Sequence, residues 1–226
     1  MADLDYQRFY ELQDRVLEVV FAVEKEFYLT GGTCLGRFYQ AKRYSDDLDF
    51  FANASPRYAF AIRRIKQALE KKFDLVIEVE GKDFNRFRID HLLRVDFVND
   101  LAEHHKDIIV TDKGYLIDNV ENILSNKLTA IIGRDNPKDI FDIYLIARFY
   151  SFSWQEMLVS AHKKAVFTDE ELIVRLKSFP PCLLSSIKLI DADFLQDFDA
   201  EFSRIVQAIA QAALEQQGKE DAPENF

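Results

Sequence analysis

Cysteine, glycine, proline and tryptophan are all scarce in this chain of 226 residues, which contains 2 Cys, 7 Gly, 5 Pro and 1 Trp. So few glycines and prolines exclude a collagen-like or low-complexity chain, and 48% hydrophobic beside 30% charged residues is typical of a globular protein. Two cysteines cannot form a disulfide framework. Cys34 and Cys182 also lie too far apart for a CxxC redox or zinc motif.

Histidine metal motifs and long apolar runs are lacking as well. The 4 histidines show no HExxH or paired-ligand spacing, which argues against a histidine-rich metal site. No apolar run approaches the roughly 18 residues of a membrane span. The segment Met1–Asp5 is acidic where a secretory signal would be basic. We therefore expect a cytoplasmic protein with no membrane partner.

Basic residues are the minority: 29 Lys and Arg stand against 39 Asp and Glu, a net charge of −10. This balance argues against general duplex binding through phosphate neutralisation. The segment Pro56–Lys72 is an exception, because it holds six basic residues against Glu70 alone, a local charge of +5. A solvated helix face explains such a run. Docking of an acidic partner, or of a nucleic-acid backbone such as a tRNA acceptor stem, explains it too.

The hydrophobic pattern predicts an α/β (α+β) protein with a small mixed sheet of about five strands flanked by helices, followed by a helical C-terminal half. Expected domains are an α/β core with an N-terminal helix over 1–115, a helical domain over 116–216 and a polar tail over 217–226. The expected strands cover 27–30, 48–51, 75–80, 84–89 and 92–97, and Thr33 is expected to cap a short helix over 34–40.

The strongest chemical signal is Gly31-Gly32-Thr33 followed by Asp47-Leu48-Asp49. Alternate side chains of a strand share a face, so Asp47 and Asp49 point the same way. Two adjacent carboxylates repel each other, and a divalent cation with a preference for hard oxygen ligands, Mg²⁺ or Mn²⁺, removes that penalty. A Gly-Gly bend lets backbone N–H groups approach a phosphate. The combination predicts a metal–triphosphate site.

Simpler explanations exist for each half of this pattern. A lone DxD is commonly a solvated surface pair, and a Gly-Gly turn before a helix is commonly only geometry. The apolar neighbours argue against these explanations. Asp47 and Asp49 interrupt a strand that contains Leu48, Phe50 and Phe51, where a charge without a function or partner is costly to bury.

The segments 31–35 and 43–51 resemble the signature of the AbiEii/AbiGii-type nucleotidyltransferases, which belong to the DNA polymerase β-like nucleotidyltransferase superfamily and are often toxins of toxin–antitoxin pairs. A second match, Lys127-Leu128-Thr129-Ala130, then Arg134, then Lys138 to Asp142, resembles the family's Lys-x-x-Ala, Arg and Lys-Asp-x-x-Asp segment on two consecutive helices. The resemblance covers about residues 27–148. It implies that 1–115 is a nucleotidyltransferase core and that the helical domain completes the active site and the acceptor pocket.

The resemblance also implies residue roles. Asp47 and Asp49 would hold the metal ions. Asp96, at the end of an expected strand, would be a third metal ligand and the general base, with Asp90 as its competitor for the role of base. The implied catalytic residues are Asp47, Asp49, Asp96, Lys127, Asp139 and Asp142. The implied nucleotide-binding residues are Gly31, Gly32, Thr33, Arg43, Ser45, Lys127, Arg134 and Lys138.

The expected function is metal-dependent transfer of a nucleoside monophosphate from a nucleoside triphosphate to an acceptor hydroxyl, on RNA or tRNA, in a toxin-like protein with a cognate antitoxin. Two alternatives stay open at this point. One keeps the chemistry but uses a small, antibiotic-type acceptor. The other is a non-catalytic nucleotide-binding or structural partner protein.

Overall fold

The computed structural model describes residues 5–220, and contacts among Cα atoms divide the chain into two compact units with the division after Asn119. This point lies close to residue 115, where the sequence pattern changes from mixed to helical. Among the described residues, no helix is both long and apolar enough to cross a membrane.

The N-terminal unit contains a mixed sheet of seven strands in the order β3-β4-β5-β2-β1-β7-β6. The pairs β2/β5 and β1/β7 are parallel, and the other neighbours are antiparallel. The predicted α/β class is confirmed, with two strands more than expected, because β6 and β7 are too short to leave a clear alternating pattern. The strands are β1 (Tyr28–Thr30), β2 (Asp47–Asn53), β3 (Leu75–Glu80), β4 (Phe84–Ile89), β5 (Leu93–Asp100), β6 (Ile109–Val110) and β7 (Leu116–Ile117).

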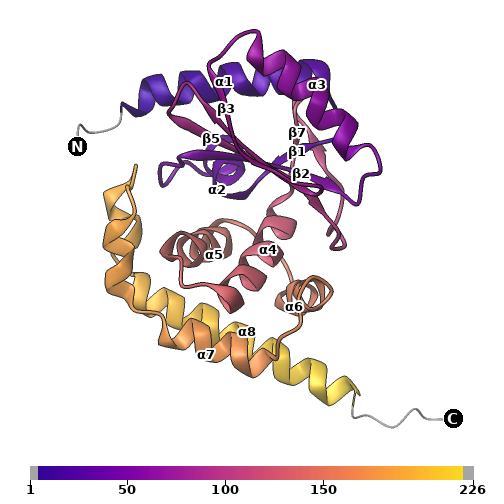
Figure 1. The fold of residues 1–226 in the computed structure, drawn as a ribbon. Helices are drawn as coiled ribbons and strands as arrows, with labels where there is room; N and C mark the ends of the chain where they lie inside the picture. The colour runs from indigo at the N-terminus through magenta and orange to yellow at the C-terminus, as the bar shows by residue number, and fades with distance from the viewer. Residues whose placement is uncertain (1–4, 221–226) are drawn as a thin grey trace, which may run out of the picture. The chain divides into compact units, whose positions relative to one another are not determined.

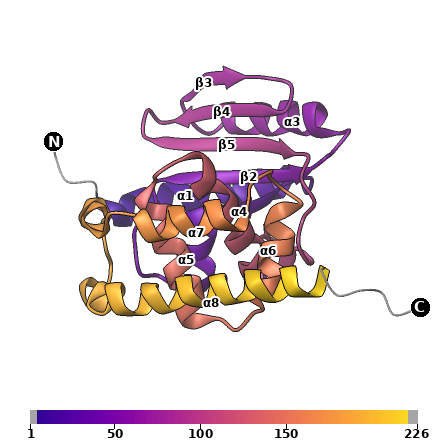
Figure 2. The same ribbon diagram turned by 90° about the horizontal axis from the view of Figure 1, so that it is seen from below.

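Helices α1 (Tyr6–Val23) and α3 (Tyr58–Glu70) cover one face of this sheet (Figure 1). Aromatic side chains fill the layer between them: the Phe50 ring centre lies 5.7 Å from that of Phe21 on α1 and 5.0 Å from that of Phe97 on β5. Because strand side chains alternate, the residues between these aromatic positions point to the opposite face. Figure 2 shows β3, β4, β5 and β2 side by side, with α3 behind them.

A short helical segment, α2 (Gly31–Cys34) followed by the π-helical turn η1 (Leu35–Tyr39), connects β1 to the loop before β2. The expectation that Thr33 caps this segment is wrong, because Thr33 lies inside α2 and Thr30 occupies the capping position. The chain enters α2 one turn earlier than predicted because Gly31 adopts φ +70°, a conformation that glycine takes without strain.

The C-terminal unit is helical, which confirms the prediction for this half. Helix α4 packs against α5, α6 and α7, and α8 packs against α6 and α7 (Figures 1 and 2). Helix α8 extends to Glu220, beyond the expected start of the polar tail at residue 217, and residues 221–226 lie outside the described part. The elements are α4 (Val120–Gly133), α5 (Pro137–Phe149), α6 (Trp154–His162), α7 (Asp169–Ser178), η2 (Pro181–Ser186), η3 (Ala192–Leu195) and α8 (Phe198–Glu220).

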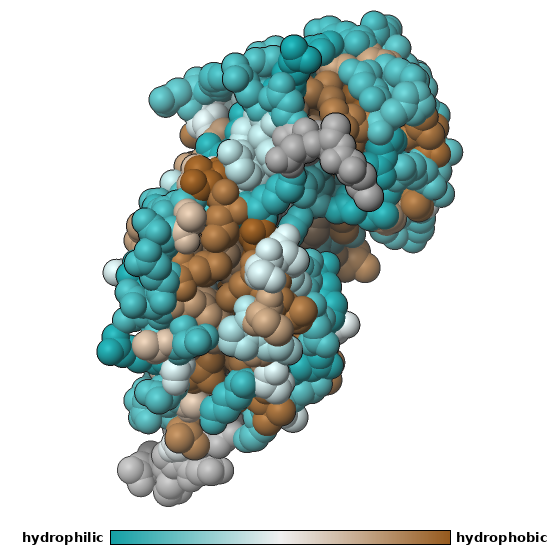
Figure 3. Space-filling model, turned by 90° about the vertical axis from the view of Figure 1, so that its left-hand side faces the viewer, coloured by the Kyte–Doolittle hydropathy of each residue, from teal (hydrophilic) through white to brown (hydrophobic). Residues whose placement is uncertain are grey.

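Hydrophobic side chains also reach the surface, as the brown areas among teal ones in Figure 3 show. In the C-terminal unit the exposed large apolar residues include Phe149, Val174, Leu183 and Ile190.

Candidate active site

The glycine turn between β1 and α2 is in close contact with two charged side chains. A Cβ atom on Gly31 would lie 2.9 Å from Oδ2 of Asp49, and a Cβ on Gly32 would lie 2.1 Å from a terminal nitrogen of Arg43. A side chain at either position would therefore displace a charged group. The two glycines let the backbone of the turn lie directly against the carboxylate of Asp49 and the guanidinium of Arg43.

The carboxylates of Asp47 and Asp49 lie on the sheet face opposite α1 and α3, whereas Leu48 between them is fully buried. Strand β5 runs parallel to β2 in a register that sets Asp96 beside Asp49 and Arg94 beside Asp47. Three of the predicted acids therefore gather on two neighbouring strands.

Two arginines on the same sheet face bind these acids, and sequence reasoning missed both. Arg86 on β4 donates two hydrogen bonds to Asp96, from Nε to Oδ1 at 2.8 Å and from NH2 to Oδ2 at 2.7 Å. Arg94 donates to Asp47, and its Nε lies 3.8 Å from Oδ2 of Asp96. Strand alternation places Arg94 on the face of Asp96, but only the pairing of β4 with β5 brings Arg86 opposite Asp96.

Asp90, the competitor of Asp96, lies elsewhere. It stands in the exposed β4–β5 turn with φ +50°, and its carboxylate accepts a hydrogen bond of 2.9 Å from the backbone N–H of Asp74. The acid that the structure places beside Asp49 is Asp96.

The hydroxyls of Thr33 and Ser45 stabilise the loop before β2. Thr33 Oγ1 donates to the carbonyl oxygen of Asp47 at 2.5 Å and lies 2.8 Å from Ser45 Oγ. The carbonyl of Ser45 accepts a hydrogen bond of 3.1 Å from Gln13 of α1. Both residues are buried, and their hydroxyl groups form hydrogen bonds within this loop.

Arg43 and Asp46 belong to the same loop. Arg43 is buried over Gly32, and its NH1 donates to the carbonyl oxygen of Tyr44 at 3.0 Å. Asp46 accepts a hydrogen bond of 2.7 Å from the hydroxyl of Tyr6 on α1. The Asp46 carboxylate therefore faces α1.

A second network follows β1, where Thr30 Oγ1 donates to the buried carboxylate of Asp118 at 2.5 Å. The other oxygen of Asp118 lies 3.0 Å from Nε2 of His104, and His104 Nδ1 lies 2.7 Å from the carbonyl oxygen of Lys106. Both ring nitrogens of His104 thus lie within hydrogen-bond distance of an oxygen atom. These contacts anchor the strand that leads into Gly31.

The C-terminal unit places four of its predicted residues in one ionic cluster. Lys127 Nζ on α4 lies 2.7 Å from Asp139 Oδ1 and 2.8 Å from Asp142 Oδ2 on α5. Arg134 donates two further hydrogen bonds to Asp139, at 2.7 and 3.0 Å. Lys127 is therefore a buried residue of an ionic network and not a solvated lysine on a helix surface. Lys138 is half-buried at the start of α5, outside these four residues.

Burial alone would raise the pKa of the Asp139 carboxyl. The charges of Lys127 and Arg134, together with their hydrogen bonds, outweigh that effect and lower the pKa below its ordinary value. Asp139 is therefore an ionised carboxylate at neutral pH.

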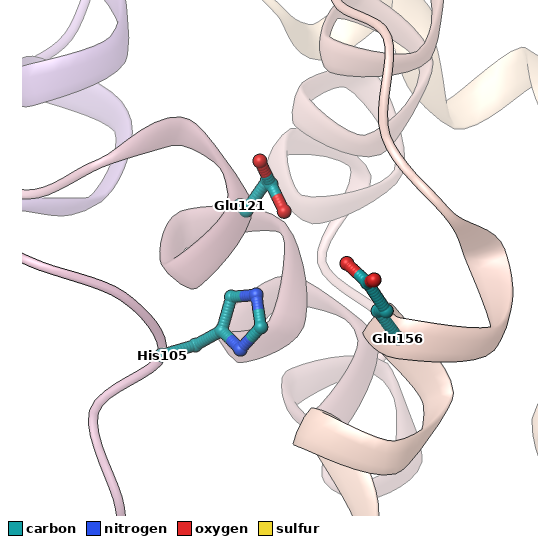
Figure 4. A group of neighbouring side chains, drawn as sticks. All are labelled: His105, Glu121 and Glu156. Carbon is teal, nitrogen blue, oxygen red and sulfur yellow. The ribbon is translucent and has the colours of Figure 1, made fainter.

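The same unit contains an acidic pair, Glu121 on α4 and Glu156 on α6, with carboxylate oxygens within 4.8 Å of each other (Figure 4). His105, also drawn in Figure 4, belongs to the N-terminal unit. Sequence reasoning did not identify this pair because its members lie on different helices.

Comparison with known proteins agrees with this fold. The chain is 28% identical over 165 residues, 70% of its length and 75% of the relative's, to an uncharacterized protein of Aquifex aeolicus. Its fold is similar to that of JHP933 from Helicobacter pylori, with a TM-score of 0.60, 22% identity and 98% of each chain covered. It is also similar to MenT4, a nucleotidyltransferase toxin of Mycobacterium tuberculosis, with a TM-score of 0.58, 13% identity and coverage of 96% of this chain and 84% of that one.

A family model described as nucleotidyl transferase AbiEii toxin, type IV toxin–antitoxin system, matches residues 15–222. That range covers the glycine turn, the acids of β2 and β5 and the ionic cluster of α4 and α5. The chain is a nucleotidyltransferase and belongs to the AbiEii toxin family.

Proposed function

We propose that the N-terminal unit binds a nucleoside triphosphate together with Mg²⁺ or Mn²⁺ and transfers the nucleoside monophosphate to an acceptor hydroxyl. The hydroxyl oxygen forms a bond to the α-phosphorus, and the bond to the β-phosphate breaks, so that pyrophosphate leaves. The observation that carries this proposal is the register of β2 and β5, which puts Asp49 beside Asp96 while the backbone of Gly31 lies against Asp49. Carboxylates and a close backbone turn are the two elements that a metal–triphosphate site needs.

The residues present fit a divalent cation. Asp47, Asp49 and Asp96 offer hard oxygen ligands on one sheet face, and this is the ligand type that Mg²⁺ and Mn²⁺ prefer. Arg86 and Arg94 offset the charge of two of the three carboxylates, so their positive charges partly replace that of a cation. When bound, the cation would supply charge neutralisation on the phosphates.

The protein's own groups have separate tasks in this proposal. The turn at Gly31 and Gly32 offers backbone N–H groups to the phosphates, and Arg43 adds a guanidinium beside Gly32. Asp96 accepts the proton of the acceptor hydroxyl with an oxygen lone pair that Arg86 does not use, since each carboxylate oxygen has two.

Catalytic roles of Lys127, Asp139 and Asp142, and nucleotide binding by Lys127, Arg134 and Lys138, remain predictions for the C-terminal unit. We propose RNA as the acceptor and a cognate antitoxin as a partner, because the family consists of toxins of toxin–antitoxin systems. A small-molecule acceptor is the alternative outcome.

The test is transfer of label from each α-labelled triphosphate, with Mg²⁺, to total RNA or to a metabolite pool. Asp49→Asn and Asp47→Asn should lower transfer at least a hundredfold while the far-UV circular dichroism stays unchanged. Asp90→Asn, an exposed acid of the same unit, is the matched control and should retain transfer. Transfer by Asp49→Asn at the wild-type rate would overturn the proposal. Label on a metabolite instead of RNA would identify a small molecule as the acceptor.

A further inference from the structure

A cavity of about 350 Å³ lies within the C-terminal unit, between the end of α5, the loop 150–153, the start of α6 and one side of α8. This volume is within the range of small-molecule sites. None of the residues assigned to the reaction lines it. Its aromatic and charged lining residues are Arg148, Tyr150, Phe152, Trp154, Glu201 and Arg204.

The positive charge of this cavity comes from two arginines on different helices. Arg148 on α5 and Arg204 on α8 both approach the carboxylate of Glu201, at 3.5 and 2.5 Å. Two guanidinium groups and one carboxylate leave a local charge of +1 in a chain whose net charge is −10. Each guanidinium has five N–H donors, so one shared carboxylate does not use them all.

The aromatic part of the lining is next to this charge. Phe152 and Trp154 meet edge to face, with ring centres 4.8 Å apart and planes at 85°. Tyr150 and both of these rings are half-buried, so each keeps accessible surface. Aromatic faces beside arginines are the combination on which bases stack while phosphates are bound.

The cavity and the ionic cluster lie at different positions along α5. Arg148 lies nine residues after Asp139, which is about 13 Å along the helix axis. The cavity is therefore separate from the ionic cluster of Lys127 and Asp139, yet fixed to it through one rigid helix.

We infer that this cavity binds one nucleotide unit, with its base on Phe152 and Trp154 and its phosphate on those N–H groups of Arg148 and Arg204 that Glu201 does not use. The source of that unit is the acceptor, a single-stranded end of RNA, and in this respect the inference rests on the proposed function. A free nucleotide offers the same chemistry, so the experiment includes both.

The test uses the full chain and its tryptophan fluorescence. The sequence has a single tryptophan, Trp154, and it lines the cavity. The probes are an oligoadenylate of roughly ten nucleotides, the same strand in a duplex, ATP and inorganic phosphate. We expect saturable quenching by the single strand and at least tenfold weaker binding of the duplex and of phosphate. If ATP quenches the fluorescence and the single strand does not, the cavity is a nucleotide site whose ligand is a free nucleotide.

Variants separate this site from the reaction. Arg204→Glu and Phe152→Ala should each weaken binding of the single strand about tenfold, through loss of a charge-assisted contact and of a stacking surface. Arg204→Lys should recover part of the affinity. Lys177→Glu, the same charge change at an exposed position of α7, should bind like the wild type.

The binding result is independent of catalysis, because Asp49→Asn should quench like the wild type even if it transfers nothing. No quenching by any probe, or equal loss of binding in Arg204→Glu and Lys177→Glu, would overturn the inference. Failure of transfer with intact binding would count against the proposed function only.

Discussion

Arg86 and Asp96 face each other on β4 and β5 and are joined by two hydrogen bonds of 2.8 and 2.7 Å. The Asp96 side chain is only 9% exposed, so this guanidinium takes the place of water as its hydrogen-bond partner. The acid that we assign as general base is thus positioned by a residue of the neighbouring strand.

Replacing Arg86 should destabilise the N-terminal unit. Arg86→Gln leaves Asp96 with a weaker partner in a buried place, and we expect a loss of about 2 kcal/mol in the free energy of unfolding, measured by urea denaturation. Arg88→Gln is the matched control, since Arg88 lies on the same strand and pairs with Glu78 at the surface, where ion pairs contribute about 0–1 kcal/mol. Equal losses in the two variants would contradict the role given to Arg86.

Gly31→Ala should impair the site without unfolding the protein. An alanine is strained at the φ of +70° that Gly31 adopts. Its Cβ would also lie 2.9 Å from Asp49 Oδ2, so the carboxylate must move. We expect transfer to fall at least tenfold and stability to fall by about 1–2 kcal/mol. Gly133→Ala meets no atom within 4 Å and should leave transfer unchanged. Full activity of Gly31→Ala would show that Asp49 need not lie against the turn.

Lys127→Met should destabilise the C-terminal unit strongly. It leaves Asp139 and Asp142 buried without their shared ammonium, a change that costs about 3–5 kcal/mol in comparable pairs. The combined variant Lys127→Met with Asp142→Asn should recover part of that loss, because one of the two carboxylates is then neutral. Thermal unfolding of both variants, beside Lys177→Met on the surface, measures this; no recovery would mean that Lys127 stabilises the unit by packing.

Acid should weaken this cluster in a defined direction. The pKa of Asp139 is lowered in the folded protein, so its stabilisation is fully present above the unfolded value of about 3.9 and is lost as pH falls through the lower folded value. Urea unfolding between neutral pH and about pH 3 should show this decline. The decline should be shallower in Asp139→Asn, and an unchanged slope would assign the acid sensitivity to other carboxylates.

Much of the fold could be predicted because its signals are local. Strands β3 and β4 begin and end where periodicity and turn residues place them, and the pair Asp47/Asp49 follows from strand alternation. Two-residue strands such as β7 leave no such pattern, so the sheet was expected to be smaller.

The partners of the acids could not be predicted because they depend on register. Arg86 lies ten residues before Asp96 in the sequence, and nothing local shows that β4 brings the two together. The contacts of Lys127 with Asp139 and Asp142 likewise depend on how α4 packs on α5. The family resemblance supplied the identity of these residues, but not their ionic pairing.

The pairing of Arg86 with Asp96 depends on the number of residues in the turn at Ile89–Leu92. Asp90 and His91 both have positive φ, at 50° and 56°, and Leu92 donates to the carbonyl of Ile89 at 2.9 Å, so the turn is tight. One inserted residue there would shift β4 against β5 by one position and turn Arg86 toward the helices. A segment with no chemical group in the reaction therefore determines whether the carboxylates are neutralised, and an insertion there would inactivate the enzyme with every acid still in place.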